Sequence, residues 1–237
     1  FGGKAAPGYY KAKDIIKLIW KLGEEIEKDK KVRDILRVIY LEDYNVSTAE
    51  VLMPATDISE QISLAGKEAS GTGCMKFMVN GALTLGTMDG ANIEIVEEAG
   101  AENAVIFGLT ADEIATIEKN HSYNPQEYLD RNPALAKVIN QLVDGTYDPT
   151  HQLFRELHDS LVYGIEGNRA DVYYVLADFD SYCKAQDKLD ELYQDRMNWA
   201  KMTLINIANS GKFSSDRTIE DYVKDIWHLK KLPRASK

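Results

Sequence analysis

The stretch GKEASGTGCMKFMVNGALTLGTMDGANIEI, residues 66–95, contains the pattern that decides the fold. A glycine-rich turn over 70–73 is followed by a helical segment over 74–80, an apolar run over 82–87 and a second helical segment over 91–99. Short apolar runs that alternate with helical segments are typical of a parallel sheet covered by helices. These residues therefore predict an α/β domain with a Rossmann-like parallel sheet and helices on both faces.

Upstream of this stretch the sequence predicts one helix and several strands. Residues 11–28 carry apolar side chains at helical spacing. The run LRVIYL, residues 36–41, is almost continuously apolar, as expected of a strand buried on both faces. Shorter strands are predicted over 1–4 and 51–54. Because the chain opens directly on Phe1 and a Gly-Gly pair, we expect it to be a fragment that lacks the earlier part of its first strand.

Downstream, AVIF at residues 104–107 predicts another strand, and Thr110–Glu113 has the S/T-x-x-E form of a capping box that opens a helix. After about residue 124 the strand signal stops. Helices are predicted over residues 124–130, 133–142, 152–163, 172–193 and 198–209, and after 214–216. The pattern therefore predicts a Rossmann-like portion, residues 1–123, and a C-terminal helical portion, residues 124–237, packed on the same domain; the first portion contains the candidate cofactor-binding residues described next.

Composition excludes several classes of protein. The net charge of −10, without a Lys/Arg cluster, argues against a nucleic-acid partner. No apolar run approaches the roughly 18 residues that span a bilayer, so no membrane association is expected. The two cysteines, Cys74 and Cys183, form no CxxC pair, which fits a reducing cytoplasm. The four histidines lack metal-ligand spacing, so no metal site is expected.

Residues 68–76, EASGTGCMK, carry the strongest chemical signal. Two glycines flank Thr72 at the start of a helix, so backbone N–H groups can point at an anion, and Lys76 follows about one turn later. That combination suits a phosphate-bearing aldehyde cofactor held on the lysine as a Schiff base. A Walker A loop is excluded because Glu68 follows the Gly66-Lys67 pair. On spacing alone, a generic phosphate loop and an ordinary capping turn remain open.

Four blocks carry a resemblance to a known family. They are FGGKAAPGYYKAK (1–13), LEDYNVSTAEVLMPATDISEQIS (41–63), the stretch 66–95, and NSGKFSSDRTIEDYVKDIW (209–227). In content and order they strongly resemble the α-glucan (glycogen, starch and maltodextrin) phosphorylases. The resemblance implies the second, C-terminal domain of a GT-B type glycosyltransferase, truncated at its N-terminal side and ending in a helical portion.

The resemblance also implies site residues. Lys76 would be the catalytic lysine and would bear pyridoxal 5′-phosphate as a covalent aldimine. The other cofactor-binding residues would be Gly71, Thr72 and Gly73 at the phosphate and Tyr44 and Val46 at the ring. The residues that bind the glucosyl unit would be Glu68, Ser70 and Gly71, with Tyr9 near the entrance of the active-site channel.

Some positions depart from the family pattern or have plainer explanations. Cys74 replaces the usual asparagine of the GTG-N-MK motif, and Asn45 stands where many relatives carry arginine. Asp89 and Asn92 have two explanations, contact with substrate and turn chemistry, and turn chemistry is the favoured one. An acid inside a glycine loop beside the lysine, by contrast, favours a functional role for Glu68.

The implied reaction is reversible phosphorolysis of the terminal α-1,4-linked glucose of an α-glucan by inorganic phosphate, which gives α-D-glucose 1-phosphate. The cofactor phosphate would act as acid and base. The full-length protein would be a homodimer through its N-terminal part, and this chain alone would be inactive. A sugar-nucleotide glycosyltransferase of the same fold and a non-catalytic assembly module remain alternatives. The sequence does not indicate the preferred glucan or any allosteric or phosphorylation control.

Overall fold

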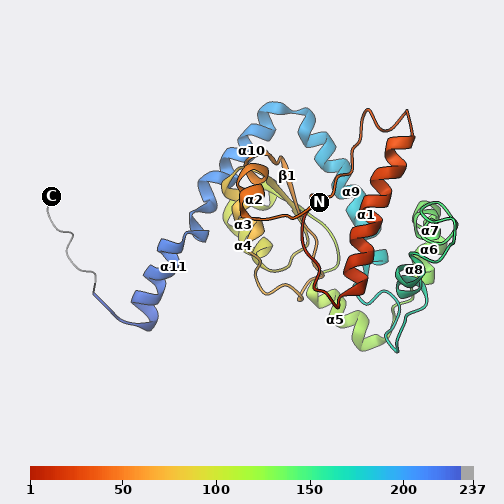
Figure 1. Cartoon of the computed structure of the whole chain (residues 1–237). Helices are drawn as coiled ribbons and strands as arrows, with labels where there is room; N and C mark the ends of the chain where they lie inside the picture. Colours follow the sequence, from red (N-terminus) through yellow and green to blue (C-terminus); the bar gives the residue numbers. More distant parts are fainter. Residues whose placement is uncertain (231–237) are drawn as a thin grey trace. The chain divides into compact units, whose positions relative to one another are not determined.

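The structure is a computed structural model of the 237-residue chain and describes residues 1–230 (Figure 1). The chain forms two compact units. Unit 1 comprises Phe1–Leu52 and Gly108–Cys183, and unit 2 comprises Met53–Phe107 and Lys184–Lys237. The long helix α9 (Val175–Gln194) contributes residues to both units.

Unit 2 contains a parallel sheet of three strands, β1 (Ile58–Gln61), β2 (Leu83–Gly86) and β3 (Val105–Ile106), in the order β1-β2-β3. β2 lies in the middle and is buried at all four of its residues. Consecutive parallel strands require a crossover, and here each crossover contains a helix. The α/β prediction with a parallel sheet is confirmed.

The crossovers of unit 2 carry its core. Helix α3 (Gly73–Val79) connects β1 to β2, and α4 (Ala91–Ala99) connects β2 to β3. Helix α10 (Arg196–Asn209) packs against α3, α4 and β2. The buried apolar cluster of the two crossover helices consists of Cys74, Met78, Ala91, Ile95 and Ala99. Short helical turns follow or precede these elements: η1 (Met53–Ala55), η2 (Ala101–Asn103), η3 (Ser210–Phe213), α11 (Ser215–Asp221) and the π-helical η4 (Tyr222–Ile226).

Unit 1 is helical in its described secondary structure. Its helices are α1 (Tyr10–Lys28), α2 (Val46–Leu52), α5 (Ala111–Asn120), α6 (Pro125–Arg131), α7 (Pro133–Asn140), α8 (Arg155–Val162) and the first part of α9. One buried cluster joins Leu135 and Ile139 of α7 to Leu176 of α9. A second joins Leu142, Phe154 and Leu157, and Leu18 of α1 packs against it. The periodicity that predicts α1, α5 and the helices after residue 124 is confirmed, with ends that differ by a few residues.

The prediction of a strand buried on both faces over residues 36–41 is wrong. The segment is extended, and Ile39 is 56% exposed. Its only strand-like pairing within residues 1–230 is an isolated parallel bridge between Gly2 and Leu41, with the Phe1 ammonium donating to the Ile39 carbonyl at 2.7 Å. An apolar run becomes a buried strand only where neighbouring strands and covering helices are present, and here a single bridge replaces them. The strand expected over 1–4 is likewise reduced to this bridge.

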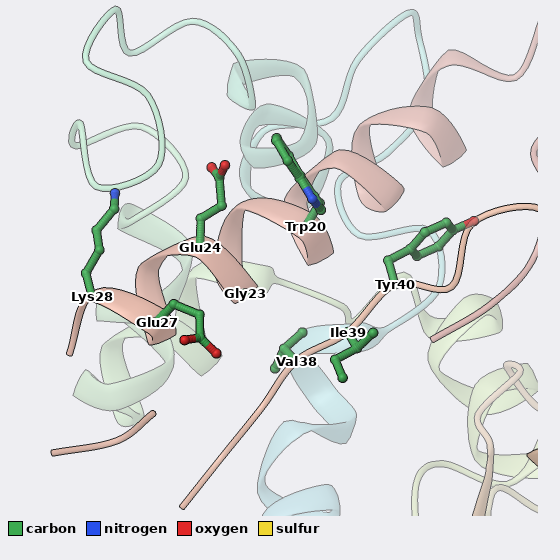
Figure 2. Close-up of a pocket in the computed structure, with 8 residues that line it drawn as sticks. All are labelled: Trp20, Gly23, Glu24, Glu27, Lys28, Val38, Ile39 and Tyr40. Atoms are coloured by element: carbon green, nitrogen blue, oxygen red, sulfur yellow. The ribbon is translucent and has the colours of Figure 1, made fainter. Parts of the chain in front are cut away.

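Helix α1 lies close to this extended segment. Figure 2 shows Gly23 and Glu27 of α1 on the side of the helix that faces Val38, whereas the Glu24 side chain points away from it. A Cβ added at Gly23 would lie 2.6 Å from the Val38 carbonyl oxygen, so the approach requires glycine there.

Two further strand assignments differ from the structure. Residues 51–54, predicted as a strand, complete α2 and begin η1. The Asn45 side chain accepts hydrogen bonds from Ser47 N at 3.0 Å and Thr48 N at 3.2 Å, so it initiates a helix that continues through this region. The strand β1 was not predicted, because its sequence ISEQ is polar and short.

Within the described residues, no helix has the length and apolar character required to cross a membrane.

Candidate active site

Two glycine-containing turns follow the carboxyl ends of β1 and β2. Residues 62–72 lead from β1 to α3, and residues 87–90 lead from β2 to α4. Because the strands are parallel neighbours, the two turns lie at the same edge of the sheet. In open α/β sheets ligands bind at this edge.

Hydrogen bonds join the bases of the two turns. Thr87 donates from its backbone N to the Gln61 carbonyl at 3.1 Å and from its hydroxyl to the Ser63 carbonyl at 2.6 Å. The buried amide of Asn92 donates to the carbonyls of Gln61 at 3.1 Å and Thr87 at 3.0 Å. The Asn92 amide therefore fixes main-chain positions, as its turn interpretation predicts.

Asp89 is the main link between the two turns. Its side chain is buried, with 4% exposed, and accepts three hydrogen bonds from the first turn: from Ser63 Oγ at 2.7 Å, Gly66 N at 2.8 Å and Glu68 N at 2.9 Å. Burial raises the pKa of this carboxyl, but the hydrogen bonds outweigh it and hold the pKa below the ordinary value. Asp89 is thus ionised, and its carboxylate oxygens accept hydrogen bonds from main-chain N–H groups and from the Ser63 hydroxyl. The sequence pointed only to turn chemistry here, and Ser63 was not identified at all.

The Glu68 side chain lies between two glycines. A Cβ added at Gly71 would lie 3.8 Å from Glu68 Cγ, and one added at Gly90 would lie 3.0 Å from the same atom. A Cβ at Gly90 would also lie 2.5 Å from the Ser70 carbonyl oxygen, which accepts a 2.6 Å hydrogen bond from Ala91 N. The Glu68 carboxylate is exposed and has one long contact, 3.4 Å from Ser70 N. It is therefore available to bind hydroxyl groups.

The GTG turn, Gly71-Thr72-Gly73, leads directly into α3. Gly71 has a φ of +81°, a conformation that side chains disfavour, and a Cβ at Gly73 would meet no atom within 4 Å. Thr72 is the N-cap residue of α3, yet its hydroxyl makes no capping hydrogen bond. The turn thus presents open space and an uncommitted hydroxyl.

Lys76 lies one turn into α3 and is exposed. Its backbone N donates to the Thr72 carbonyl at 3.3 Å, and its carbonyl accepts from the Asn80 amide at 2.8 Å. In the part of the chain that the structure describes, no carboxylate lies within 4.0 Å of the Lys76 ammonium. An accessible amine beside an open, donor-rich turn fits a phosphate-bearing aldehyde cofactor.

Cys74, which departs from the family pattern, is a core residue whose Sγ lies 3.7 Å from a Cβ placed at Gly71. It is 2% exposed and packs in the core cluster with Met78, Ala91 and Ile95. Burial raises the pKa of its thiol, so the thiol is neutral and unreactive near neutral pH. Its role is to fill the core behind the turn.

The remaining predicted site residues lie in unit 1. Tyr44 is partly buried, and its ring lies 3.0 Å from a Cβ placed at Gly2. Val46 begins α2 and is 73% exposed, and Tyr9 precedes α1 and is 52% exposed. The structure places Glu68 beside Gly71 and Gly90, and Lys76 one turn into the helix that the GTG turn opens. The roles of all the predicted site residues, Tyr44, Val46 and Tyr9 included, stay predictions.

The cavities found lie elsewhere. One of about 560 Å³ lies in unit 1 between α1 and the extended segment and contains none of the predicted site residues (Figure 2). Its lining residues are Trp20, Gly23, Glu24, Glu27, Lys28, Val38, Ile39 and Tyr40. Within residues 1–230 no group of three or more His, Cys, Asp or Glu side chains is arranged to hold a metal ion.

Comparisons with known proteins give one consistent family. A family model described as "Carbohydrate phosphorylase" matches residues 1–229. The chain is 52% identical over 227 residues to the muscle form of glycogen phosphorylase from Mus musculus. The aligned residues make up 95% of this chain and 26% of that protein. It is 47% identical over 232 residues to glycogen phosphorylase from Bacillus subtilis, covering 98% of this chain and 28% of that protein. The chain thus spans about a quarter of the length of these relatives.

Proposed function

This chain belongs to the carbohydrate phosphorylase family, and on that premise we propose that the protein carrying it is an α-glucan phosphorylase. Its reaction would be reversible phosphorolysis of the terminal α-1,4-linked glucose, with α-D-glucose 1-phosphate as product. The observation that supports the proposal is the open GTG turn at the carboxyl edge of the sheet, with the Glu68 side chain beside Gly71 and the exposed Lys76 one turn into the helix that this turn opens.

Pyridoxal phosphate is the cofactor of the proposal. Lys76 would be its covalent anchor, while the N–H groups of Gly71 and Gly73 and the Thr72 hydroxyl would hold its phosphate. When bound, the cofactor supplies a phosphate whose second pKa of about 6 suits proton exchange with the substrate phosphate near neutral pH. Tyr44 and Val46 would flank its ring.

Glu68, Ser70 and Gly71 would bind the glucosyl unit. The Glu68 carboxylate is exposed, and its position between Gly71 and Gly90 fixes the direction from which it can accept sugar hydroxyls. Hydrogen bonds to a charged carboxylate contribute about 1.5–3 kcal/mol each. Orientation of the sugar is therefore a role that this side chain can perform without taking part in bond breaking.

The proposal includes the wider organisation. The chain would belong to the second domain of a GT-B type enzyme, with an opposing domain and the contacts of a homodimer in parts that this chain does not span. The cytoplasm is the proposed compartment, because thiols such as Cys74 stay reduced there.

Product analysis with the whole protein tests this function. The whole protein, incubated with maltoheptaose, inorganic phosphate and pyridoxal phosphate, should release glucose 1-phosphate, and Lys76→Ala should abolish the release. Lys119→Ala is the matched control, because Lys119 is likewise an exposed lysine in the last turn of a helix but lies in α5 of unit 1, and it should retain turnover. Glucosyl transfer from a sugar nucleotide that survives Lys76→Ala would contradict the proposal in favour of a nucleotide-dependent glycosyltransferase.

A further inference from the structure

We propose that Asp89 is a positioning residue: through the main chain of residues 66–68, it holds the Glu68 side chain where sugar hydroxyls can reach it. The inference rests on the proposed function, and it extends that function to a residue that contacts no substrate.

Besides a backbone hydrogen bond from Gly90, the donors to Asp89 belong to one turn, residues 62–72. Ser63 lies at the start of that turn, Gly66 in the middle and Glu68 at the end, and the three hydrogen bonds measure 2.7–2.9 Å. A carboxylate that is 4% exposed is tolerated because such donors satisfy it. The same burial keeps Asp89 away from a ligand. Its effect on a ligand must therefore pass through the turn that it holds.

The segment Glu68–Ser70 is fixed at both of its ends by residues 89–91. Asp89 accepts from Glu68 N at 2.9 Å, and Ala91 N donates to the Ser70 carbonyl at 2.6 Å. Between these contacts the segment packs on Gly90, which has no side chain to hold it away. The backbone position of Glu68, and with it the direction of its side chain, follows from these two hydrogen bonds.

The arrangement requires a carboxylate. Gly66 N donates to Oδ1, while Ser63 Oγ and Glu68 N donate to Oδ2, so both oxygens must accept. Asparagine accepts at one atom only, and its NH₂ group would face an N–H donor. Asparagine has nearly the same shape as aspartate, but Asp89→Asn should lose the main-chain hydrogen bond at one of the two side-chain atoms, either from Gly66 N or from Glu68 N. Ser63→Ala, which leaves both amide hydrogen bonds in place, should have a smaller effect.

A double-mutant cycle in the whole protein tests the inference. Asp89→Asn should lower kcat by about 100-fold, the scale expected when a binding group is misplaced by about 1 Å, with cofactor content unchanged. In the Glu68→Gln background the same change should lower kcat by less than about threefold, because the group it positions is already altered. Glu68→Gln alone should reduce kcat while the protein stays folded.

Asp171→Asn is the matched control. Asp171 is 1% exposed and accepts three hydrogen bonds, from the Tyr123 hydroxyl and from Val175 N and Leu176 N, but it lies in unit 1. Its substitution should lower Tm and leave kcat of the folded protein near the wild-type value. An equal loss of kcat in Asp171→Asn would mean that any buried-carboxylate defect reduces turnover, and this would overturn the positioning role.

Amide hydrogen exchange provides a readout that is independent of turnover. In Asp89→Asn the Gly66 or Glu68 amide should exchange faster, while the Asn80 and Gly81 amides at the far end of α3 keep their wild-type rates. Unchanged exchange at both Gly66 and Glu68, or equal losses of kcat in the two backgrounds of the cycle, would overturn the inference and leave the proposed function intact. Absence of wild-type turnover in the same series would instead overturn the proposed function, and the inference with it.

Discussion

Asp178 on α9 is a carboxylate whose surroundings oppose its charge. Its pKa is raised to about 6, chiefly by burial and to a smaller extent by the nearby charges of Asp171 and Glu113, while the hydrogen bond from Leu109 N opposes the rise. That hydrogen bond measures 2.8 Å and ties the loop before α5 to α9. The folded protein therefore keeps a proton on Asp178 at a pH where the unfolded chain has lost it.

Because of this pKa shift, we expect Asp178→Asn to raise the free energy of unfolding by an amount that depends on pH. Because the folded pKa lies above the ordinary value of 3.8, the stability linked to Asp178 is largest below that value and falls as pH rises toward about 6. Asparagine can still accept from Leu109 N and carries no charge. The variant should gain about 1–2 kcal/mol in free energy of unfolding at pH 7.5, after allowance for solvent screening, and little at pH 4.

Urea unfolding of the wild-type chain and Asp178→Asn at the two pH values measures this gain. Asp187→Asn, an exposed aspartate of the same helix, is the control and should show no such difference. If Asp178→Asn is less stable than the wild type at pH 7.5, the folded protein does not disfavour the charged form of Asp178, and the prediction is wrong.

At the scale of residues, sequence reasoning reached the local features and missed the non-local ones. The GTG turn at the start of a helix could be predicted from residues 68–76 alone, whereas the role of Lys76 is implied by the resemblance of longer blocks and stays a prediction. Asp89 and its donors Gly66 and Ser63 are 23 and 26 residues apart, and only the parallel pairing of β1 with β2 brings them together. A turn motif alone does not identify which main-chain groups its carboxylate will meet.

At the scale of elements, the capping box of α5 was predicted from sequence and is confirmed. Thr110 accepts from Glu113 N at 3.3 Å, and Thr110 N donates to the Glu113 carboxylate at 2.8 Å. The hydrogen bonds from the Thr110 backbone and hydroxyl hold the pKa of Glu113 below its ordinary value. The box satisfies two N–H groups that a helix start otherwise leaves without partners.

Removing this cap should destabilise the chain measurably. Thr110→Ala should lower the free energy of unfolding by about 1 kcal/mol at pH 7. Because the folded pKa of Glu113 is depressed, its contribution is present above the ordinary value of 4.5 and is lost as pH falls below it. The difference between variant and wild type should therefore shrink at pH 3.5.

Thr116→Ala in the same helix is the control for this measurement. The Thr116 hydroxyl donates to the Asp112 carbonyl, a bond internal to the helix, and alanine has the higher helix propensity. Its free energy of unfolding should change little. If Thr110→Ala is as stable as Thr116→Ala in denaturant titrations at pH 7, the cap does not stabilise α5.

Secondary-structure elements could be predicted where the local sequence alone determines them. Helix α1 follows from its own apolar spacing, and α5 follows from its spacing and its capping box. The strands depend on partners elsewhere in the chain: LRVIYL is extended but forms only a bridge at Leu41, whereas the polar ISEQ becomes β1 because β2 pairs with all four of its residues. Hydrophobicity alone therefore assigned the wrong one of these two segments to the sheet.

At the scale of the whole molecule, the 237-residue chain should not catalyse phosphorolysis by itself. It spans about a quarter of its phosphorylase relatives, and beside the GTG turn it offers chiefly Lys67 and Lys76 as cations. Two phosphates held close together require several positive charges, and Lys76, as the proposed cofactor anchor, would not supply a free ammonium. The purified chain with maltoheptaose, phosphate and excess pyridoxal phosphate should release no glucose 1-phosphate. Turnover that Lys76→Ala abolishes would show that the chain contains a complete site.

The most direct test of the central claim is the identity of the modified lysine. The whole protein is loaded with pyridoxal phosphate, reduced with borohydride, digested and mapped by mass spectrometry. An exposed amine without a carboxylate partner among the described residues, one helical turn from the GTG turn, should make Lys76 the single site of the pyridoxyl group within residues 1–237. A pyridoxyl group on Lys67 or Lys4 in place of Lys76 would contradict the account.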